Sequence, residues 1–273
     1  MAVAALTACE NADSGLQVEN NTKVTLSFSP YDSAPIASSR RAAVAISTYA
    51  THLDIWLVSG DEVIDLHQSS TDNSFGTLAV DLNKTKTYTL YAVAHKCTDN
   101  ATLSNGIISF PEEKVTHAFF YTTTFSPATT TELSCTMPRI VGQFRLEITD
   151  AVPDEVAKFN YTINDTYTRW NVAGTGSNQI DRTGTINVTS KNNDGSVTIN
   201  IFLIPTNLTD TDHLDITFTA LTSTDAVVET HTFNNVPVKA NYKTTCHGTF
   251  FVSASATMTF LADDWEIFDT IDF

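Results

Sequence analysis

Cys9 is the residue whose surroundings most clearly define a chemistry. It ends the run LTAC (6–9), and the polar segment 10–15 follows it. In a lipoprotein signal, small residues beside the scissile bond permit cleavage, and the cysteine thiol then forms a thioether to diacylglycerol. The apolar run before Cys9 is short and has no basic segment, so we interpret residues 1–15 as a signal remnant and tether. A buried cysteine on an ordinary N-terminus is the alternative.

The overall charge limits the partners that this chain can have. The sequence contains 31 acidic and 15 basic side chains, which gives a formal net charge of −16. This charge repels phosphate backbones and anionic lipid headgroups, so we expect no nucleic-acid partner and no electrostatic membrane binding. No segment after Cys9 approaches the roughly 18 to 20 apolar residues of a spanning helix. Membrane attachment would therefore rest on acyl chains such as palmitate at Cys9.

The other cysteines allow two interpretations. If Cys9 is acylated, Cys97, Cys135 and Cys246 remain, and three cysteines cannot all pair within one chain. The absence of a C-x-x-C motif argues against a zinc ribbon or a thioredoxin-like site. Cys97 and Cys135 either form a disulfide in an oxidising compartment or lie buried as small apolar side chains.

The sequence contains no recognisable catalytic constellation. It lacks G-x-S-x-G, H-E-x-x-H and phosphate-loop motifs, and its seven histidines are scattered. We therefore expect neither an enzyme nor a cofactor. Asp210, Asp212 and Asp215 are the best calcium candidates, because hard cations bind clustered carboxylates. A solvated loop is the alternative, since the glycine and distal glutamate of an EF-hand are missing.

Two further groups of residues could serve recognition or processing. Trp56, Trp170 and Trp265 are candidate platforms for sugar rings, although their positions near alternating segments favour core or inter-domain packing. Of these, Trp170 is the one that we most expect to be exposed. The dibasic pair Arg40 and Arg41 lies in a predicted loop, where a trypsin-like protease could cut and release the first strand. An ordinary loop with two charges is the alternative.

Alternation of apolar and polar residues with a period of two dominates the sequence, and helical periodicity is nearly absent. Segments 24–28, 144–148 and 214–218 show this pattern. The turn residues 59–61 and 192–195 each predict a hairpin between the strands that flank them. Many short strands with turns about every ten residues predict an all-β protein built of β-sandwiches.

A domain boundary is expected near residue 137. The polar, proline-containing stretch 126–131 is followed by one short strand, and the alternation then begins again at Met137. The sequence therefore predicts sandwich domains over residues 16–136 and 137–273, each of an ordinary domain size.

Several of these segments resemble fimbrillin-type proteins of Bacteroidales. Residues 236–251, VPVKANYKTTCHGTFF, are similar to the late hairpin of that superfamily, where V-P-[VL]-[KR]-x-N-x-[KR]-T-x-x-x-G precedes the final strands. Residues 257–265 resemble the closing strand and its tryptophan. Residues 138–146 resemble the start of the second domain, and residues 53–57 resemble a strand of the first. The LTAC run also fits, and the most similar group is that of FimB/Mfa2-like fimbrial anchors and minor subunits.

This resemblance implies a fold, a location and a function. The fold would be two tandem transthyretin-like (Greek-key) β-sandwiches, exported as a lipoprotein to the cell outer membrane. The function would be that of a surface-tethered fimbrial anchor, minor subunit or cell-adhesion protein without catalysis. Its partners would be other fimbrial subunits, or ligands on host or bacterial surfaces, bound through strand edges. We also expect residues 267–273 to pair as an edge or donor strand.

A second function remains open from the sequence. A carbohydrate-binding outer-membrane lipoprotein of a glycan-uptake system would have the same composition and the same tether. Exposed coplanar aromatic rings would favour this alternative.

Overall fold

The computed structural model describes residues 20–30, 45–192 and 194–252, together with the backbone of three short strands near the C-terminus. Within these ranges the chain is all-β, as the alternation predicted, and the helical segments are two single 3-10 turns, η1 (Ile46–Thr48) and η2 (Pro111–Glu113). None of the helical segments in this described part is long and apolar enough to cross a membrane.

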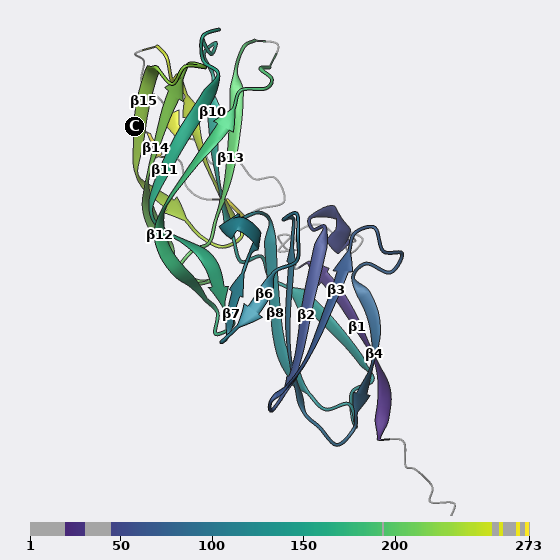
Figure 1. The fold of residues 1–273 in the computed structure, drawn as a ribbon. Helices are drawn as coiled ribbons and strands as arrows, with labels where there is room; N and C mark the ends of the chain where they lie inside the picture. Colours follow the sequence, from purple (N-terminus) through teal and green to yellow (C-terminus); the bar gives the residue numbers. More distant parts are fainter. Residues whose placement is uncertain are drawn as a thin grey trace, which may run out of the picture.

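The described strands fall into two consecutive groups (Figure 1). The first group is β1 (Asn21–Pro30), β2 (His52–Ser59), β3 (Glu62–Ser69), β4 (Thr77–Asn83), β5 (Tyr88–His95), β6 (Thr102–Ser104), β7 (Ile107–Ser109), β8 (Ala118–Phe125) and β9 (Glu132–Met137). The second group is β10 (Gly142–Ile148), β11 (Lys158–Asn171), β12 (Thr175–Asn187), β13 (Val197–Leu203), β14 (Asp212–Leu221), β15 (Val227–Val238), β16 (Tyr242–Gly248), β17 (Thr257–Met258), β18 (Glu266–Ile267) and β19 (Ile271–Asp272).

The first half of the chain forms a β-sandwich. One sheet has the strand order β4-β1-β9, and the other has the order β3-β2-β5-β8. β1 pairs antiparallel with β4 and parallel with β9. Both sheets contribute side chains to one apolar core, which includes Leu26 of β1 and Leu90 of β5. The period-two alternation thus buries one face of each sheet against the other.

The second half repeats the same topology. β10 pairs antiparallel with β13 and parallel with β16, and the order in the facing sheet is β12-β11-β14-β15. In chain order, β10 to β16 therefore correspond to β1 to β5, β8 and β9. The core of this half includes Phe144 and Phe218, whose rings stack with centroids 5.9 Å apart. The division at residue 137 remains a prediction, which this repeat supports.

One predicted hairpin is wrong, although its turn forms. The Gly195 N–H donates to Asn192 O at 2.9 Å, as in a tight turn. The flanking strands nevertheless belong to different sheets, since β12 pairs with β11 and β13 pairs with β10. The turn therefore connects the two layers of the sandwich. By contrast, the turn at Gly60 joins β2 and β3 as a hairpin, with Ser59 opposite Glu62.

The last strands extend the sheet that contains β16. β17 pairs antiparallel with β16, and β18 pairs parallel with it. β19 pairs with β17 and takes the outer position. Part of segment 267–273 thus lies at a sheet edge, whereas its role as a donor strand remains a prediction. Trp265 lies outside the described residues.

Candidate functional site

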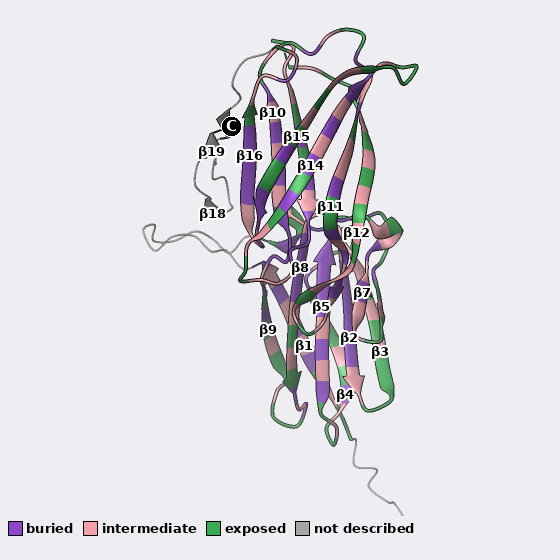
Figure 2. Cartoon of the chain, turned by 90° about the vertical axis from the view of Figure 1, so that its left-hand side faces the viewer, coloured by how far each residue is buried: buried purple, intermediate pink, exposed green. Residues whose placement is uncertain are grey.

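The two halves meet at an apolar junction cluster. Trp56 and Trp170 are its largest side chains and are only 2% and 0% exposed. The Trp170 ring lies 6.3 Å from the Phe120 ring, measured between centroids. In Figure 2 the buried stretches of β5 and β8 extend up to this junction. Both tryptophans therefore pack inside the chain, as the alternating segments favoured, and Trp170 is not exposed as a sugar platform.

The β6–β7 hairpin carries the first half of the chain into a sheet of the second half. β7 pairs antiparallel with β11, with Ile108 opposite Trp170. A strand from one sandwich thus extends a sheet of the next by backbone hydrogen bonds. This hairpin could not be predicted from the sequence, because each of its strands has only three residues, too few to show a period.

Asp54 is a fully buried carboxylate that fixes this hairpin to β2. It accepts hydrogen bonds from His67 Nδ1 and His95 Nε2, both at 2.7 Å, and from the Ala101 N–H at 2.8 Å. His67 Nε2 also lies 3.2 Å from Asp65 Oδ1. Three donors satisfy the buried charge, which would otherwise be costly. Sequence reasoning missed this network because Asp54 and His95 are 41 residues apart.

The network changes the proton affinity of His95. Burial is the largest single influence and lowers the pKa of His95, but the interactions with Asp54 and Cys97 together outweigh it and raise that pKa from an ordinary 6.5 to about 9. The Cys97 N–H lies 3.2 Å from His95 Nδ1 and can donate only while this nitrogen carries no proton. Protonation of Nδ1 would break that hydrogen bond. The stability calculated from the raised pKa of His95 is therefore an upper limit.

The pKa of His117, which lies just before β8, is shifted in the opposite direction. Burial, with Arg139 and Lys96 nearby, lowers the pKa of His117 from 6.5 to about 4. Its ring lies 4.4 Å from the ring of Phe202 in the second half. A proton on His117 would therefore place a poorly solvated charge at the contact between the halves.

Stability is expected to peak near pH 6.5. The raised pKa of His95 gives stability that is complete below pH 6.5 and is lost as the pH rises to about 9, with an upper limit of about 3 kcal/mol. The lowered pKa of His117 gives a smaller contribution, lost as the pH falls from 6.5 towards 4. Urea unfolding between pH 4 and 9 measures both. In His95→Gln the free energy of unfolding should change less with pH above pH 6.5 only, and in His117→Gln below pH 6.5 only. An unchanged pH dependence in both variants would contradict this assignment.

Among the strands that the structure describes, β9 forms an unpaired edge of its sheet. The Thr25 N–H of β1 donates to Thr131 O at 2.9 Å. Because a parallel ladder uses alternate residues, the backbone N–H and C=O groups of Glu132, Ser134 and Thr136 point away from β1. In the second half, β17 and β18 pair with β16 on the equivalent side. Among the described strands, none pairs with β9 there.

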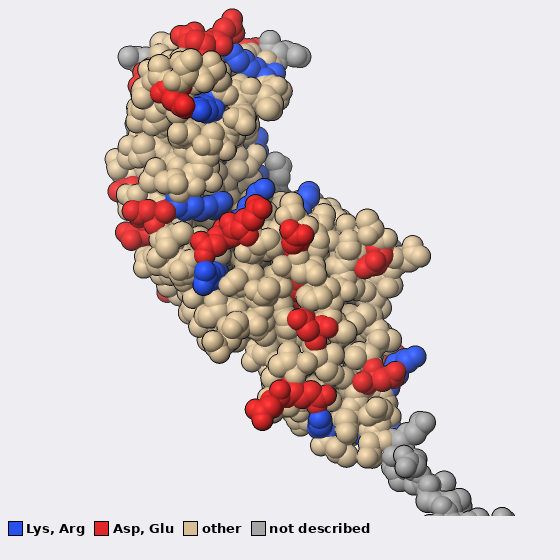
Figure 3. Space-filling model, in the orientation of Figure 1, with Lys and Arg blue, Asp and Glu red and all other residues tan. Residues whose placement is uncertain are grey.

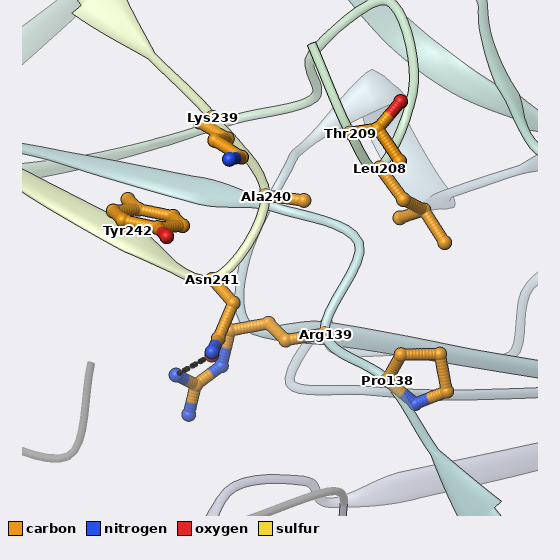
Figure 4. Close-up of a pocket in the computed structure, with 8 residues that line it drawn as sticks. All are labelled: Pro138, Arg139, Leu208, Thr209, Lys239, Ala240, Asn241 and Tyr242. Carbon is orange, nitrogen blue, oxygen red and sulfur yellow. Dashed lines mark hydrogen bonds between the residues drawn. The ribbon is translucent and has the colours of Figure 1, made fainter. Parts of the chain in front are cut away.

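A pocket of about 290 Å³ lies beside the linker between the halves (Figure 4). Arg139 is only 5% exposed and donates from Nη1 to Asn241 Oδ1 at 3.1 Å. Its guanidinium carbon also lies 5.1 Å and 5.0 Å from the ring centroids of Tyr49 and Phe119. These contacts hold the cation inside the chain. We therefore interpret this pocket as part of the packing of the linker. Its lining residues are Pro138, Arg139, Leu208, Thr209, Lys239, Ala240, Asn241 and Tyr242.

The cysteines predicted as a possible pair are free thiols. Cys97 packs in the junction cluster, and Cys135 packs in the core of the first half. Burial raises the pKa of the Cys135 thiol to about 12. Cys246 is also a free buried thiol, in the core of the second half. The structure thus agrees with the interpretation of buried thiols, and Cys97 and Cys135 form no bridge in it.

The three aspartates considered for calcium serve local roles. Asp212 accepts a hydrogen bond from the Thr206 N–H at 2.6 Å, and Asp215 accepts one from the Asn235 N–H at 2.9 Å. Asp210 is exposed in the loop before β14. Across the described ranges, no group of three or more His, Cys, Asp or Glu side chains is arranged to hold a metal ion. These contacts support the solvated-loop alternative.

Three predicted site residues lie outside the described residues. Cys9 precedes residue 20, and both Arg40 and Arg41 fall in the segment 31–44. Acylation at Cys9 and cleavage after the dibasic pair therefore remain predictions.

Two solved structures share this fold at low sequence identity, and a third is similar to the chain at a lower TM-score. A candidate adhesin from Bacteroides ovatus is 12% identical with a TM-score of 0.55, and the match covers 92% of this chain and 96% of that one. A candidate polysaccharide-binding protein from Bacteroides thetaiotaomicron is 10% identical with a TM-score of 0.53, covering 87% and 95%. The fimbrial anchor protein Mfa2 from Porphyromonas gingivalis is 9% identical with a TM-score of 0.46, covering 91% and 99%.

The first two structures match the fold over most of the chain, so the predicted likeness to Bacteroidales surface proteins is confirmed for the fold. No curated protein matches the chain. One family model, described as a family of unknown function (DUF6562), matches residues 16–267, a range that includes both sandwiches and the junction. The chain therefore belongs to the DUF6562 family.

Proposed function

We propose that this protein is a non-enzymatic cell-surface adhesion protein of the fimbrial type, which binds another protein by strand addition at the outer edge of β9. The observation that carries this proposal is the unpaired edge, because an open row of backbone donors and acceptors is a template for a further strand. The strand β16, which corresponds to β9 in the second half, pairs with β17 and β18 on the same side.

Two other observations support strand addition. The β6–β7 hairpin already extends a sheet of the other half by this means. The alternate β9 side chains Cys135 and Met137 are buried in the core beneath this edge. An added strand would therefore extend a sheet whose inner face is apolar, where alternate side chains of a partner could pack. The similar structures named as adhesins share this fold.

The proposed location is the cell outer membrane, with the chain held by acyl chains on Cys9. Two acyl chains give stable attachment, since each buried methylene contributes about 0.8 kcal/mol. The partners would be other fimbrial subunits or ligands on neighbouring cell surfaces. A glycan-uptake lipoprotein is less well supported, because Trp56 and Trp170 are buried.

Acylation should be visible in the mass of the protein. Expression with a complete signal should yield a chain that begins at Cys9 and carries diacylglycerol and further acyl mass. Intact mass spectrometry of the membrane fraction measures this directly. Cys9→Ser should release the protein from the membrane; a membrane-bound Cys9→Ser protein of unmodified mass would contradict the anchor.

Ser134→Pro should block strand addition without unfolding the sandwich. The Ser134 N–H points away from β1, and proline is tolerated at such an edge position because no ladder bond is lost. A partner strand would lose a donor and meet the proline ring. We expect about tenfold less fimbrial protein to co-purify with the variant from the cell surface. Ser134→Ala is the matched control, since it keeps the N–H. Undiminished co-purification by a folded Ser134→Pro protein would contradict the proposal.

A further inference from the structure

A second, larger pocket lies between the β11–β12 ribbon and the η2 turn. Its volume is about 420 Å³, and its walls include Glu112, Glu113, Tyr161, Thr168 and Arg182. This volume is within the range of about 300–1,000 Å³ that is usual for small-molecule sites. Acidic and basic side chains gather in the region where the two halves meet (Figure 3). The pocket is separate from the β9 edge.

Two charged side chains of the pocket walls, Glu113 and Arg182, are held by polar partners. Arg169 Nη2 donates to Glu113 Oε1 at 2.7 Å. Asn178 Nδ2 lies 3.3 Å from the same oxygen and 2.8 Å from Thr168 Oγ1. Arg182 Nη1 donates to a backbone carbonyl at 2.9 Å. Acidic and basic side chains at the pocket are equal in number: Glu112, Glu113 and Asp181 against Lys114, Arg169 and Arg182. A pocket without net charge and with oriented polar groups suits an uncharged ligand with many hydroxyl groups.

Tyr161 adds an aromatic surface to this pocket. It lies opposite Gly184 of β12, and a Cβ at Gly184 would overlap the tyrosine hydroxyl. The glycine thus allows the tyrosine side chain to lie across the edge strand. The Arg182 guanidinium carbon is 6.0 Å from the ring centroid. An aromatic ring beside planar polar groups suits a sugar, which has one apolar C–H face and a rim of hydroxyls.

The η2 turn holds its carboxylates at this pocket in a strained conformation. Glu112 has φ 54° and Glu113 has φ 53°, both in the left-handed region that disfavours residues with a Cβ. The Glu113 carboxylate has Arg169 as its partner. Glu112 is exposed and makes no hydrogen bond or ion pair with any described residue. Its carboxylate is therefore available to accept hydrogen bonds from a ligand.

We propose that this pocket binds an uncharged saccharide of one or two rings. The apolar face of one ring would pack against Tyr161, and hydroxyls of the sugar would donate hydrogen bonds to the Glu112 carboxylate. The site would give the protein a small-molecule ligand in addition to a protein partner. It does not depend on strand addition at β9, so the two proposals fail independently.

Four disaccharides serve as probes in isothermal titration calorimetry with the full chain: maltose, lactose, cellobiose and N,N′-diacetylchitobiose. At least one is expected to bind with 1:1 stoichiometry and a dissociation constant of about 1 mM or tighter. Glu112→Gly should weaken this binding about tenfold, while its melting temperature stays equal or rises because glycine accepts the left-handed backbone.

Asn105→Gly is the matched control. Asn105 also has a positive φ, 50°, in the β6–β7 turn, and it does not line the pocket. This change relieves the same kind of strain and should leave the affinity unchanged. Tyr161→Phe should bind, whereas Tyr161→Leu should bind about tenfold more weakly because the ring is lost. Should Tyr161→Leu fail to fold, Glu112→Gly still decides the question.

Three results would overturn the proposal. The first is an absence of binding by the unmodified chain to all four disaccharides. The second is binding that Glu112→Gly leaves unchanged in a folded protein. The third is binding confined to glucuronic acid or glucosamine, tested as charged sugars, which would contradict an uncharged ligand.

Discussion

Asp54→Ala is expected to lower the free energy of unfolding by about 3–5 kcal/mol, because removing one member of a buried charged network leaves the other members unpaired. The carboxylate is fully buried and accepts hydrogen bonds from His67, His95 and the Ala101 N–H. All three donors lose their acceptor in the variant. The loss should be largest for the segment that begins at Ala101, since the Asp54 carboxylate holds its start to β2.

Urea unfolding measures the change in stability, and hydrogen exchange locates it. We expect the amides of the β6–β7 hairpin to lose protection before those of the sandwich cores, because the hairpin would then open without global unfolding. Asp65→Ala is the matched control: Asp65 contacts the same histidine, His67, but its side chain is 54% exposed. That variant should lose less than about 1 kcal/mol. A similar small loss in Asp54→Ala would contradict the role assigned to the network.

Trp170→Ala should lower the free energy of unfolding by about 3–5 kcal/mol, since it removes one of the two largest side chains of the junction from a site with no solvent exposure. The cavity would lie between Phe120 of the first half and β11 of the second. The halves should then unfold in separate steps, because their shared apolar contact would be weakened. Differential scanning calorimetry with near-ultraviolet circular dichroism would detect the second transition.

Trp170→Phe provides the control for this change. The indole Nε1 has no hydrogen-bond partner in the described part of the chain, so phenylalanine loses ring area but no hydrogen bond. We expect a loss of about 1–2 kcal/mol and a single unfolding transition. A single transition in Trp170→Ala, with the stability of the unmodified chain, would show that the junction cluster does not couple the halves.

The sequence was sufficient to predict those features that depend on neighbouring residues. Alternation of apolar and polar residues identified strands such as β10 and β14, because successive side chains of a strand point to opposite faces. The Ser59–Asp61 turn gave the β2–β3 hairpin, since the Gly60 φ of +61° is a local preference of glycine. The burial of Trp56 and Trp170 followed from their places near alternating segments. The partners of Trp170 could not be predicted, because β7 and Phe120 cover it from the other half.

The candidate sites were largely hidden from the sequence. The open edge of β9 depends on which strands lie beside β1, and the three-residue strands of the β6–β7 hairpin show no period. The donors to Asp54 and the walls of the η2 pocket come from segments far apart in the chain. The amino-acid composition likewise gave no indication of which residues would meet at these sites.

By itself, the sequence of this protein determined the all-β class, most of the strands and the residues that face the cores, because these follow from local periodicity and turn chemistry. Only the tertiary structure decided that the turn at Gly195 connects two sheets, that β7 extends the sheet of β11 and that Asp54 binds two histidines. The physical reason is that a strand's backbone hydrogen bonds can be satisfied by many partners. The choice among them is made by long-range packing of apolar faces, which no local segment encodes.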